Sequence, residues 1–133
     1  MQVTLTIDYA MWILTLLGKT TERINAATMS ERLHIPRRYT IKILNRLKES
    51  GLVEVCAGVK GGYHLARGLD EISFGDVAKA MGQSIKISKC LEDGGGCTFG
   101  KKEECNARCF YQALQEKLEE GLFNVTLQEI QRP

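Results

Sequence analysis

Four of the five cysteines in this 133-residue chain lie within twenty residues, with six, seven and three residues between them: Cys90, Cys97, Cys105 and Cys109. Thiolates bind soft metals and clusters, and grouped thiols also respond to oxidants. The cysteine count is odd, and the first eight residues lack the basic side chains of a secretory signal. We therefore expect a cytoplasmic protein whose reduced thiols bind a metal or sense redox state.

The spacing of the thiols bears on the kind of metal. A structural zinc site usually has two close cysteine pairs, and only Cys105 and Cys109 have that spacing. Iron-sulfur clusters are larger and accept thiolates from a long loop. A helix beginning near Cys105 would stabilise thiolates and an anionic cluster through its positive dipole end. The spacing favours an iron-sulfur cluster, with zinc or unligated thiols as alternatives.

Grouped thiols could also belong to an enzyme. A thiol-disulfide oxidoreductase could use Cys105 and Cys109. However, no Cys-x-x-Cys lies beside a βαβ pattern, and no acid-base constellation accompanies the thiols. We therefore expect that the chain is not an enzyme.

Charge is unevenly distributed along the chain. The net charge is only +2, but residues 1–67 hold ten Lys and Arg against five Asp and Glu, whereas residues 68–133 hold eight against eleven. Residues 32–60 include seven basic residues and only two acidic ones, Glu49 and Glu54. The first half is therefore the candidate for binding a polyanion, with a simple solvated face as the alternative.

The elements that position these residues follow from periodicity and caps. Apolar residues at helical spacing predict a helix over residues 4–18, which Gly18 ends. Asn25 is a good N-cap for a short helix, and Pro36 starts another that runs to a left-handed cap at Gly51. Alternating residues around 58–62 then predict a β-hairpin with a glycine-rich turn. No apolar stretch approaches the length of a membrane span.

The second half is predicted to hold a short helix, a long loop and a long helix. Ser73 and Asp76 resemble a capping box, and Gly82 closes the helix that they open. Residues 83–104 form a loop too long for a simple connector. Apolar residues at helical spacing mark a helix over residues 105–120, with a short continuation near residues 126–130.

A helix pair followed by a hairpin is the order of a winged helix-turn-helix, whose second helix enters the major groove. Basic residues in the first two turns of that helix and at the hairpin tip are placed to contact bases or phosphates. We expect double-stranded DNA as the partner. The candidate contact residues are Arg37, Arg38, Tyr39, Lys42, Lys60 and Gly61.

The chain resembles the winged-helix transcription regulators of the IscR, NsrR and CymR type over nearly its whole length. The resemblance is carried by Asp8-Tyr9-Ala10, residues 35–39, LKESGLVEV, GVKGGYHLAR, ISFGDVAKAM, the cysteine loop and VTLQEI. It implies a homodimer that pairs through long C-terminal helices and binds a two-fold-related operator. It also implies that Cys90, Cys97 and Cys105 hold an iron-sulfur cluster.

Two candidates are open for a fourth ligand. Asp8 matches the position from which NsrR-like proteins supply a carboxylate across the dimer, while Cys109 lies one helical turn after Cys105. The chain also departs from its relatives in two places. Ile41 stands where IscR-like proteins carry an acidic residue. The wing has residues 57–63, Ala-Gly-Val-Lys-Gly-Gly-Tyr, where many relatives have Arg-Gly-Pro-Gly-Gly-Gly-Tyr, so a minor-groove contact by an arginine does not carry over. Operator rules therefore do not transfer from those relatives.

The predicted fold is mostly α with a small β-hairpin wing: a winged helix-turn-helix followed by a long C-terminal dimerisation helix. Residues 1–82 are expected to bind DNA, residues 83–104 to hold a cluster of the 2Fe-2S or 4Fe-4S kind, and residues 105–133 to form the dimerisation helix and tail. The function expected is DNA-binding transcription regulation controlled by this cluster. A cluster-free regulator controlled by thiol redox or a protein partner is the alternative.

Overall fold

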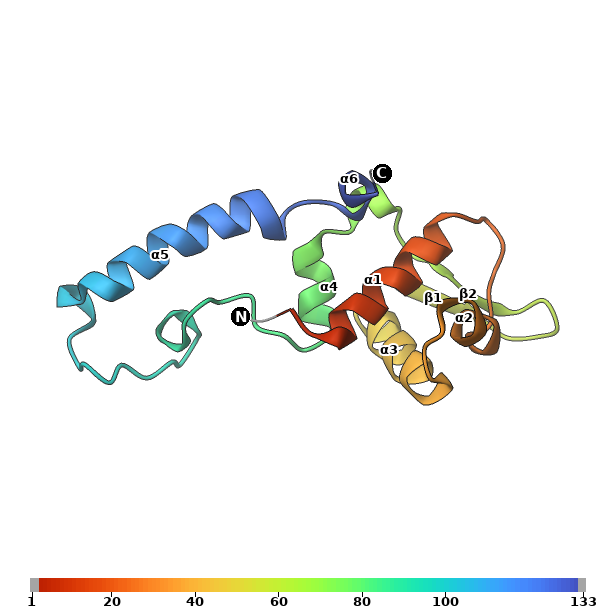
Figure 1. The fold of residues 1–133 in the computed structure, drawn as a ribbon, viewed down its shortest axis with the longest axis horizontal. Helices are drawn as coiled ribbons and strands as arrows, with labels where there is room; N and C mark the ends of the chain where they lie inside the picture. Colours follow the sequence, from red (N-terminus) through yellow and green to blue (C-terminus); the bar gives the residue numbers. More distant parts are fainter. Residues whose placement is uncertain (1–2, 132–133) are drawn as a thin grey trace.

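The computed structural model describes residues 3–131 and is mostly helical, as predicted (Figure 1). The helices are α1 (Leu5–Gly18), α2 (Ala26–Leu33), α3 (Arg37–Glu49), α4 (Phe74–Ala80), α5 (Asn106–Leu118) and α6 (Leu127–Ile130). Strands β1 (Val53–Cys56) and β2 (Gly62–Leu65) form an antiparallel hairpin in which Val53 pairs with Leu65 and Cys56 with Gly62. None of the helices within this described part is long and apolar enough to cross a membrane.

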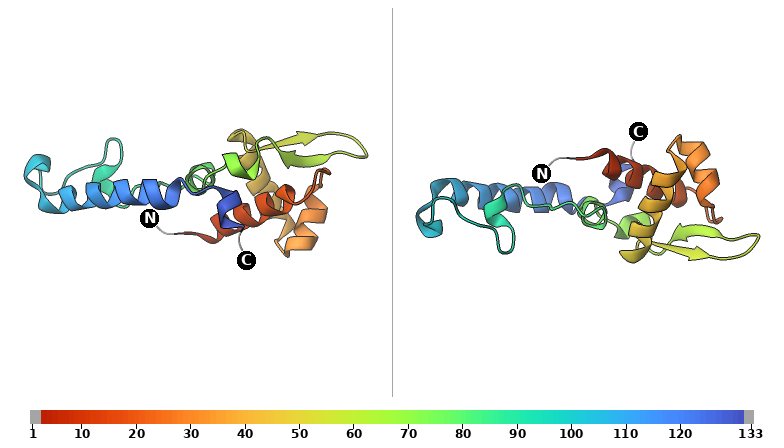
Figure 2. Two further views of the ribbon diagram at one scale, coloured as in Figure 1. Left: turned by 90° about the horizontal axis from the view of Figure 1, so that it is seen from above. Right: turned by 90° about the horizontal axis from the view of Figure 1, so that it is seen from below.

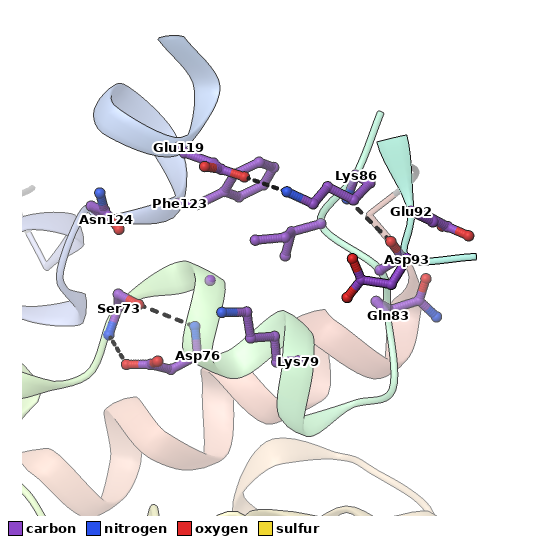
Figure 3. A pocket seen from close by; sticks show the side chains of 13 residues that line it. Ser73, Asp76, Lys79, Gln83, Lys86, Glu92, Asp93, Glu119, Phe123 and Asn124 are labelled. Atoms are coloured by element: carbon purple, nitrogen blue, oxygen red, sulfur yellow. Dashed lines mark hydrogen bonds and ion pairs between the residues drawn. The ribbon is translucent and has the colours of Figure 1, made fainter. Parts of the chain in front are cut away.

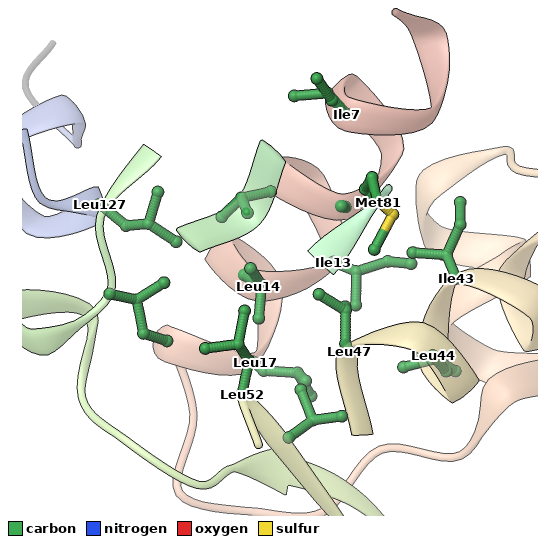
Figure 4. Packing of buried hydrophobic residues seen from close by; sticks show 14 of the residues in the cluster. Ile7, Ile13, Leu14, Leu17, Ile43, Leu44, Leu47, Leu52, Met81 and Leu127 are labelled. Atoms are coloured by element: carbon green, nitrogen blue, oxygen red, sulfur yellow. The ribbon is translucent and has the colours of Figure 1, made fainter. Parts of the chain in front are cut away.

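The core lies where α1 meets α3, α4 and the hairpin (Figure 4). Each of these elements contributes side chains at the period of its own secondary structure, so their apolar faces meet in one cluster. This cluster holds α3 in place and leaves the opposite face of that helix free. Its fully buried members include Ile7, Ile13, Leu14, Leu44 and Leu47.

Local signals set the ends of the helices. The Asn25 side chain accepts a hydrogen bond from the Thr28 N–H at 2.8 Å, so the predicted N-cap is confirmed. Pro36 occupies the N-cap position, so α3 begins at Arg37, one residue later than predicted. Gly51 adopts φ = +74°, the left-handed conformation predicted after this helix. The capping box between Ser73 and Asp76 is also formed.

Gly18 ends α1 as predicted, but not because it adopts a left-handed conformation. The residue after it, Lys19, caps the helix in the right-handed region. A Cβ atom at position 18 would collide with the side chain of Leu69. The glycine therefore allows the turn Leu69–Glu71 to pack directly on the end of α1.

Helix α5 extends away from the winged domain, with the cysteine-containing loop beside it (Figures 1 and 2). After a π-helical segment over Glu119–Phe123, the chain returns to the domain through α6. Leu127 is fully buried, and its N–H donates to the Ile72 carbonyl at 2.8 Å. The segment expected to follow the dimerisation helix as a tail therefore contributes to the core of the first domain.

Candidate nucleic-acid interface and cysteine loop

Helix α3 presents a basic outer face because its inner face is fixed in the core. Thr40, Ile43, Leu44 and Leu47 are buried on the inner face. No acidic residue lies in the first turn, so the positive end of the helix dipole adds to the charge of the arginines there. The exposed residues of the first two turns are Arg37, Arg38, Tyr39, Ile41 and Lys42.

Arg38 and Tyr39 interact on this outer face. The guanidinium carbon of Arg38 lies 5.5 Å from the centroid of the Tyr39 ring, which is a cation–π distance. Tyr39 itself is 44% exposed, so the ring is not a core residue. The pair presents a positive charge and an aromatic face side by side.

The tip of the hairpin is a tight turn closed by a hydrogen bond from the Gly61 N–H to the Gly58 carbonyl at 3.0 Å. Val59 and Lys60 occupy the two corner positions of this turn and are exposed. A Cβ atom at Gly61 would collide with the carbonyl of Cys56, so glycine is required there. Lys60 is thus held at the outermost point of the wing.

A pair of backbone hydrogen bonds fixes the wing relative to the helix pair. Ile24 donates to the Tyr63 carbonyl at 3.1 Å, and Tyr63 donates to the Ile24 carbonyl at 2.8 Å. Ile24 immediately precedes Asn25, the cap of α2. The wing and the helix-turn-helix are therefore one unit, and no local sequence pattern predicts this bridge.

The three predicted cluster cysteines are free, half-buried and hydrogen-bonded. Cys90 lies in the turn Lys89–Leu91, with its Sγ 3.2 Å from the Ser88 hydroxyl oxygen. The Cys97 Sγ accepts a hydrogen bond from the Gly100 N–H at 3.3 Å. The Cys105 Sγ caps α5 by accepting from the Arg108 N–H at 3.4 Å. Two of the three sulfurs therefore accept hydrogen bonds from backbone N–H groups.

The proposed ligands do not converge in the single chain. Among residues 3–131, no three His, Cys, Asp or Glu side chains are close enough to hold a metal ion. Cys109 is exposed on the first turn of α5, one turn after Cys105. Asp8 lies half-buried near the start of α1, on a different element from the loop.

Gln115 fastens the start of the cysteine loop to α5. Its side-chain carbonyl accepts from the Ile87 N–H at 2.8 Å, and its amide donates to the Ile85 carbonyl at 2.9 Å and to Glu119 at 3.0 Å. Only 4% of this residue is exposed. Sequence reasoning missed Gln115, because a glutamine between apolar helix positions does not identify its partner.

A second link lies beside Gln115, at the edge of a cavity of about 600 Å³ that α4, the loop and the π segment line (Figure 3). The Lys86 ammonium contacts the Glu119 carboxylate at 3.1 Å. The Gln115 hydrogen bond, followed by those from Lys86, lowers the pKa of Glu119 below its usual value. Glu119 therefore stays ionised while it links the loop to the end of α5.

Helix α3 contacts the residue at which this loop begins. The Arg46 guanidinium donates to the Met81 carbonyl at 3.0 Å. Met81 caps α4, and the loop begins immediately after it. The loop therefore leaves the domain at a residue that α3 holds directly.

Two helices joined by a turn, a hairpin bridged to them and a basic outer face on the second helix define a winged helix-turn-helix protein of the DNA-binding class. More specifically, the chain belongs to the Rrf2 family. Residues 3–133 match the model of that family, which is described as an iron-dependent transcriptional regulator. The chain is thus a transcription regulator and not an enzyme, as predicted.

Individual relatives agree with this membership. The HTH-type transcriptional regulator IscR of Klebsiella pneumoniae is 33% identical over 114 residues, which are 86% of this chain and 68% of the relative. The structure of CymR, the global cysteine regulator of B. subtilis, matches with a TM-score of 0.76 at 20% identity and covers 98% of this chain and 95% of that one. IscR of T. potens matches with a TM-score of 0.71 at 21% identity, covering 98% and 85%.

Proposed function

We propose that the protein binds a two-fold-symmetric DNA operator as a homodimer, and that an iron-sulfur cluster controls its affinity for that operator. The observation that supports DNA binding is the outer face of α3. This face is exposed and basic, while the opposite face of the helix is buried in the core. The family's iron dependence supports the second part. The expected division into residues 1–82, 83–104 and 105–133 is retained as a proposal about these roles.

The DNA contacts are assigned to two elements. Arg37 and Arg38 at the exposed start of α3 reach base edges or phosphates, with Tyr39 and Lys42 beside them. At the wing, Lys60 pairs with a phosphate. Gly61 has no side chain, so the hairpin turn stays tight and the DNA backbone can approach it.

Apolar side chains exposed along α5 support the homodimer. On α5 itself, Phe110 is 62% exposed and Leu114, one turn later, is 37% exposed, and an apolar groove lies beside Leu118 at the end of this helix. Isolated exposed apolar residues are ordinary, but several of them on one projecting helix are typical of a protein interface. A second copy that packs α5 against α5 would cover this surface and set the distance between two recognition helices.

The chemistry of the loop fits an iron-sulfur cluster. Cys90, Cys97 and Cys105 offer three soft sulfur ligands on one segment, and backbone N–H groups donate to two of them. Because the three sulfurs are apart in the single chain, the proposal requires this segment to rearrange when it is loaded. A bound cluster would supply a centre sensitive to oxygen, nitric oxide or iron supply.

Asp8 is the preferred fourth ligand and Cys109 the alternative. A carboxylate binds iron-sulfur iron more weakly than a thiolate, which suits a position that must open to a signal. Cys109 is exposed one turn from Cys105, so the two could chelate one metal centre. Asp8 would act from the partner subunit, which agrees with its position outside the loop.

Anaerobic purification tests the proposal. We expect a brown protein that contains iron and sulfide and shifts a specific DNA duplex with an affinity that changes when the cluster is removed. By linkage, DNA should change cluster stability by the same factor. A colourless protein that nevertheless binds DNA would favour the alternative regulator controlled by thiol oxidation or a protein partner. Stoichiometric zinc without iron would favour a structural metal.

A further inference from the structure

The outer face of α3 contains one aliphatic side chain that the core does not use. Ile41 is 41% exposed and is absent from both the buried core and the half-buried residues packed against it. Its apolar surface therefore contributes little to the stability of this chain, since burial is what makes such surface stabilising.

The surroundings of Ile41 are polar and basic. Arg37 lies one turn before it and Asn45 one turn after it, while Arg38 is three residues away. Residues at these separations are neighbours on a helix surface. Ile41 thus sits in the middle of the stripe that carries the proposed DNA contacts.

Helix formation does not explain an isoleucine at this position. A β-branched side chain loses rotamer freedom in a helix, so lysine, glutamine or leucine would be slightly more favourable at an exposed site. The expected dimer interface does not explain it either, because α5 extends away from the winged domain that contains α3 (Figures 1 and 2).

The major groove offers one apolar group on a base-pair edge, which is the C5-methyl group of thymine. We propose that Ile41 contacts a thymine methyl in each operator half-site and thereby determines specificity at that base pair. The neighbouring arginines supply charge and hydrogen bonds, while Ile41 supplies an apolar contact that cytosine, guanine and adenine cannot match. This inference rests on the proposed DNA-binding function.

The test uses an operator selected from random duplexes with the anaerobically purified full-length chain. Each thymine is then replaced in turn by deoxyuracil, which removes only the methyl group. We expect one symmetric pair of replacements to weaken wild-type binding about fourfold per half-site and about 15-fold for both, the scale of one buried methyl group each. Ile41→Ala should bind the thymine operator correspondingly weakly and lose nothing further with uracil.

Two variants serve as controls. Ile41→Val keeps most of the branched surface and should retain most of the methyl dependence. Val55→Ala removes a β-branched side chain of equal 41% exposure from β1 and should leave the uracil effect unchanged. Circular dichroism and the melting temperature establish that each variant is folded.

The outcomes separate this inference from the function on which it rests. If no duplex is selected, the DNA-binding proposal fails and the inference fails with it. If Arg38→Ala weakens binding but uracil has no effect at any position, only the methyl contact is wrong. If uracil weakens wild type and Ile41→Ala equally, another residue or the DNA shape reads the methyl group, and the inference is also wrong.

Discussion

The side-chain carbonyl of Gln115 accepts a hydrogen bond from the Ile87 N–H at 2.8 Å, joining α5 to the start of the cysteine loop. The same amide donates to the Ile85 carbonyl at 2.9 Å, so one side chain pairs with the backbone in both directions. Since Gln115 is buried, water cannot replace these partners freely. The position of the loop is therefore set by a helix outside the winged domain.

We expect Gln115→Leu to lower the free energy of unfolding by about 1–3 kcal/mol, because it leaves backbone groups without partners at a similar side-chain volume. Hydrogen exchange at the Ile87 amide should accelerate. Gln112→Leu is the matched control, since Gln112 is exposed on the same helix. Equal exchange in both variants would show that Gln115 does not anchor the loop.

The lowered pKa of Glu119 gives stability a pH dependence. A carboxyl with a lower pKa in the folded than in the unfolded chain stabilises the fold above its unfolded pKa, and this contribution is lost as the pH falls through the folded pKa. Glu119→Gln should therefore be less stable than wild type at pH 7, and the difference should vanish in acid. Because the side chain is 36% exposed, we expect about 0.5 kcal/mol by denaturant titration. A constant difference at all pH values would contradict this account.

The sequence could predict the features that depend on neighbouring residues, but not those that join distant residues, such as the hydrogen bonds of Gln115. The Asn25 cap, the capping box at Ser73 and the left-handed Gly51 were predictable because each signal spans at most a few residues. The helical periods of α1 and α3 were also readable, because burial repeats along each helix. The period of α5 was readable from its apolar residues, although Phe110, Ala113 and Leu114 are exposed in the single chain. Local patterns therefore predicted the elements and the basic face of α3.

The unpredicted features all join distant parts of the chain. Gln115 meets Ile87 across 28 residues, and Gly18 meets Leu69 across a larger separation. The burial of Leu127 in the first domain likewise depends on where α5 turns back. A single sequence carries no periodic signal for such pairs. For the same reason, it shows that four thiols are grouped along the chain but not how they are arranged in space.

Removal of a basic side chain from α3 should weaken operator binding without changing the dimer or any cluster. For Arg37→Ala or Arg38→Ala we expect a loss of about 1–3 kcal/mol and relaxed specificity at one base pair if the arginine contacts a base. If it contacts a phosphate, the salt dependence should become shallower instead. Fluorescence anisotropy at several salt concentrations measures both effects, and Lys117→Ala on α5 controls for charge. Unchanged binding in the double variant would remove the assignment of α3.

Cluster binding should require all three of the predicted cluster cysteines. We expect Cys90→Ala, Cys97→Ala and Cys105→Ala each to abolish or strongly reduce the visible absorption of anaerobically reconstituted protein, since a missing thiolate leaves an iron site open to solvent. Cys56→Ala, on β1 outside the loop, should keep the spectrum. A full spectrum in any of the three loop variants would exclude that residue as a ligand.

The fourth ligand is decided by comparing Asp8→Ala with Cys109→Ala under the same reconstitution. We expect the aspartate variant to change the cluster spectrum and to make the cluster more labile, because a carboxylate from α1 of the partner subunit would be lost. The cysteine variant should keep its spectrum, since Cys109 is an exposed residue of α5. Mixed dimers of Asp8→Ala with Cys90→Ala test the cross-subunit assignment: if Asp8 acts across the dimer, both mutations fall on the same cluster site and the other site is intact. Loss of the spectrum in Cys109→Ala alone would show that the ligand lies one turn after Cys105, and α1 would then have no direct connection to the cluster.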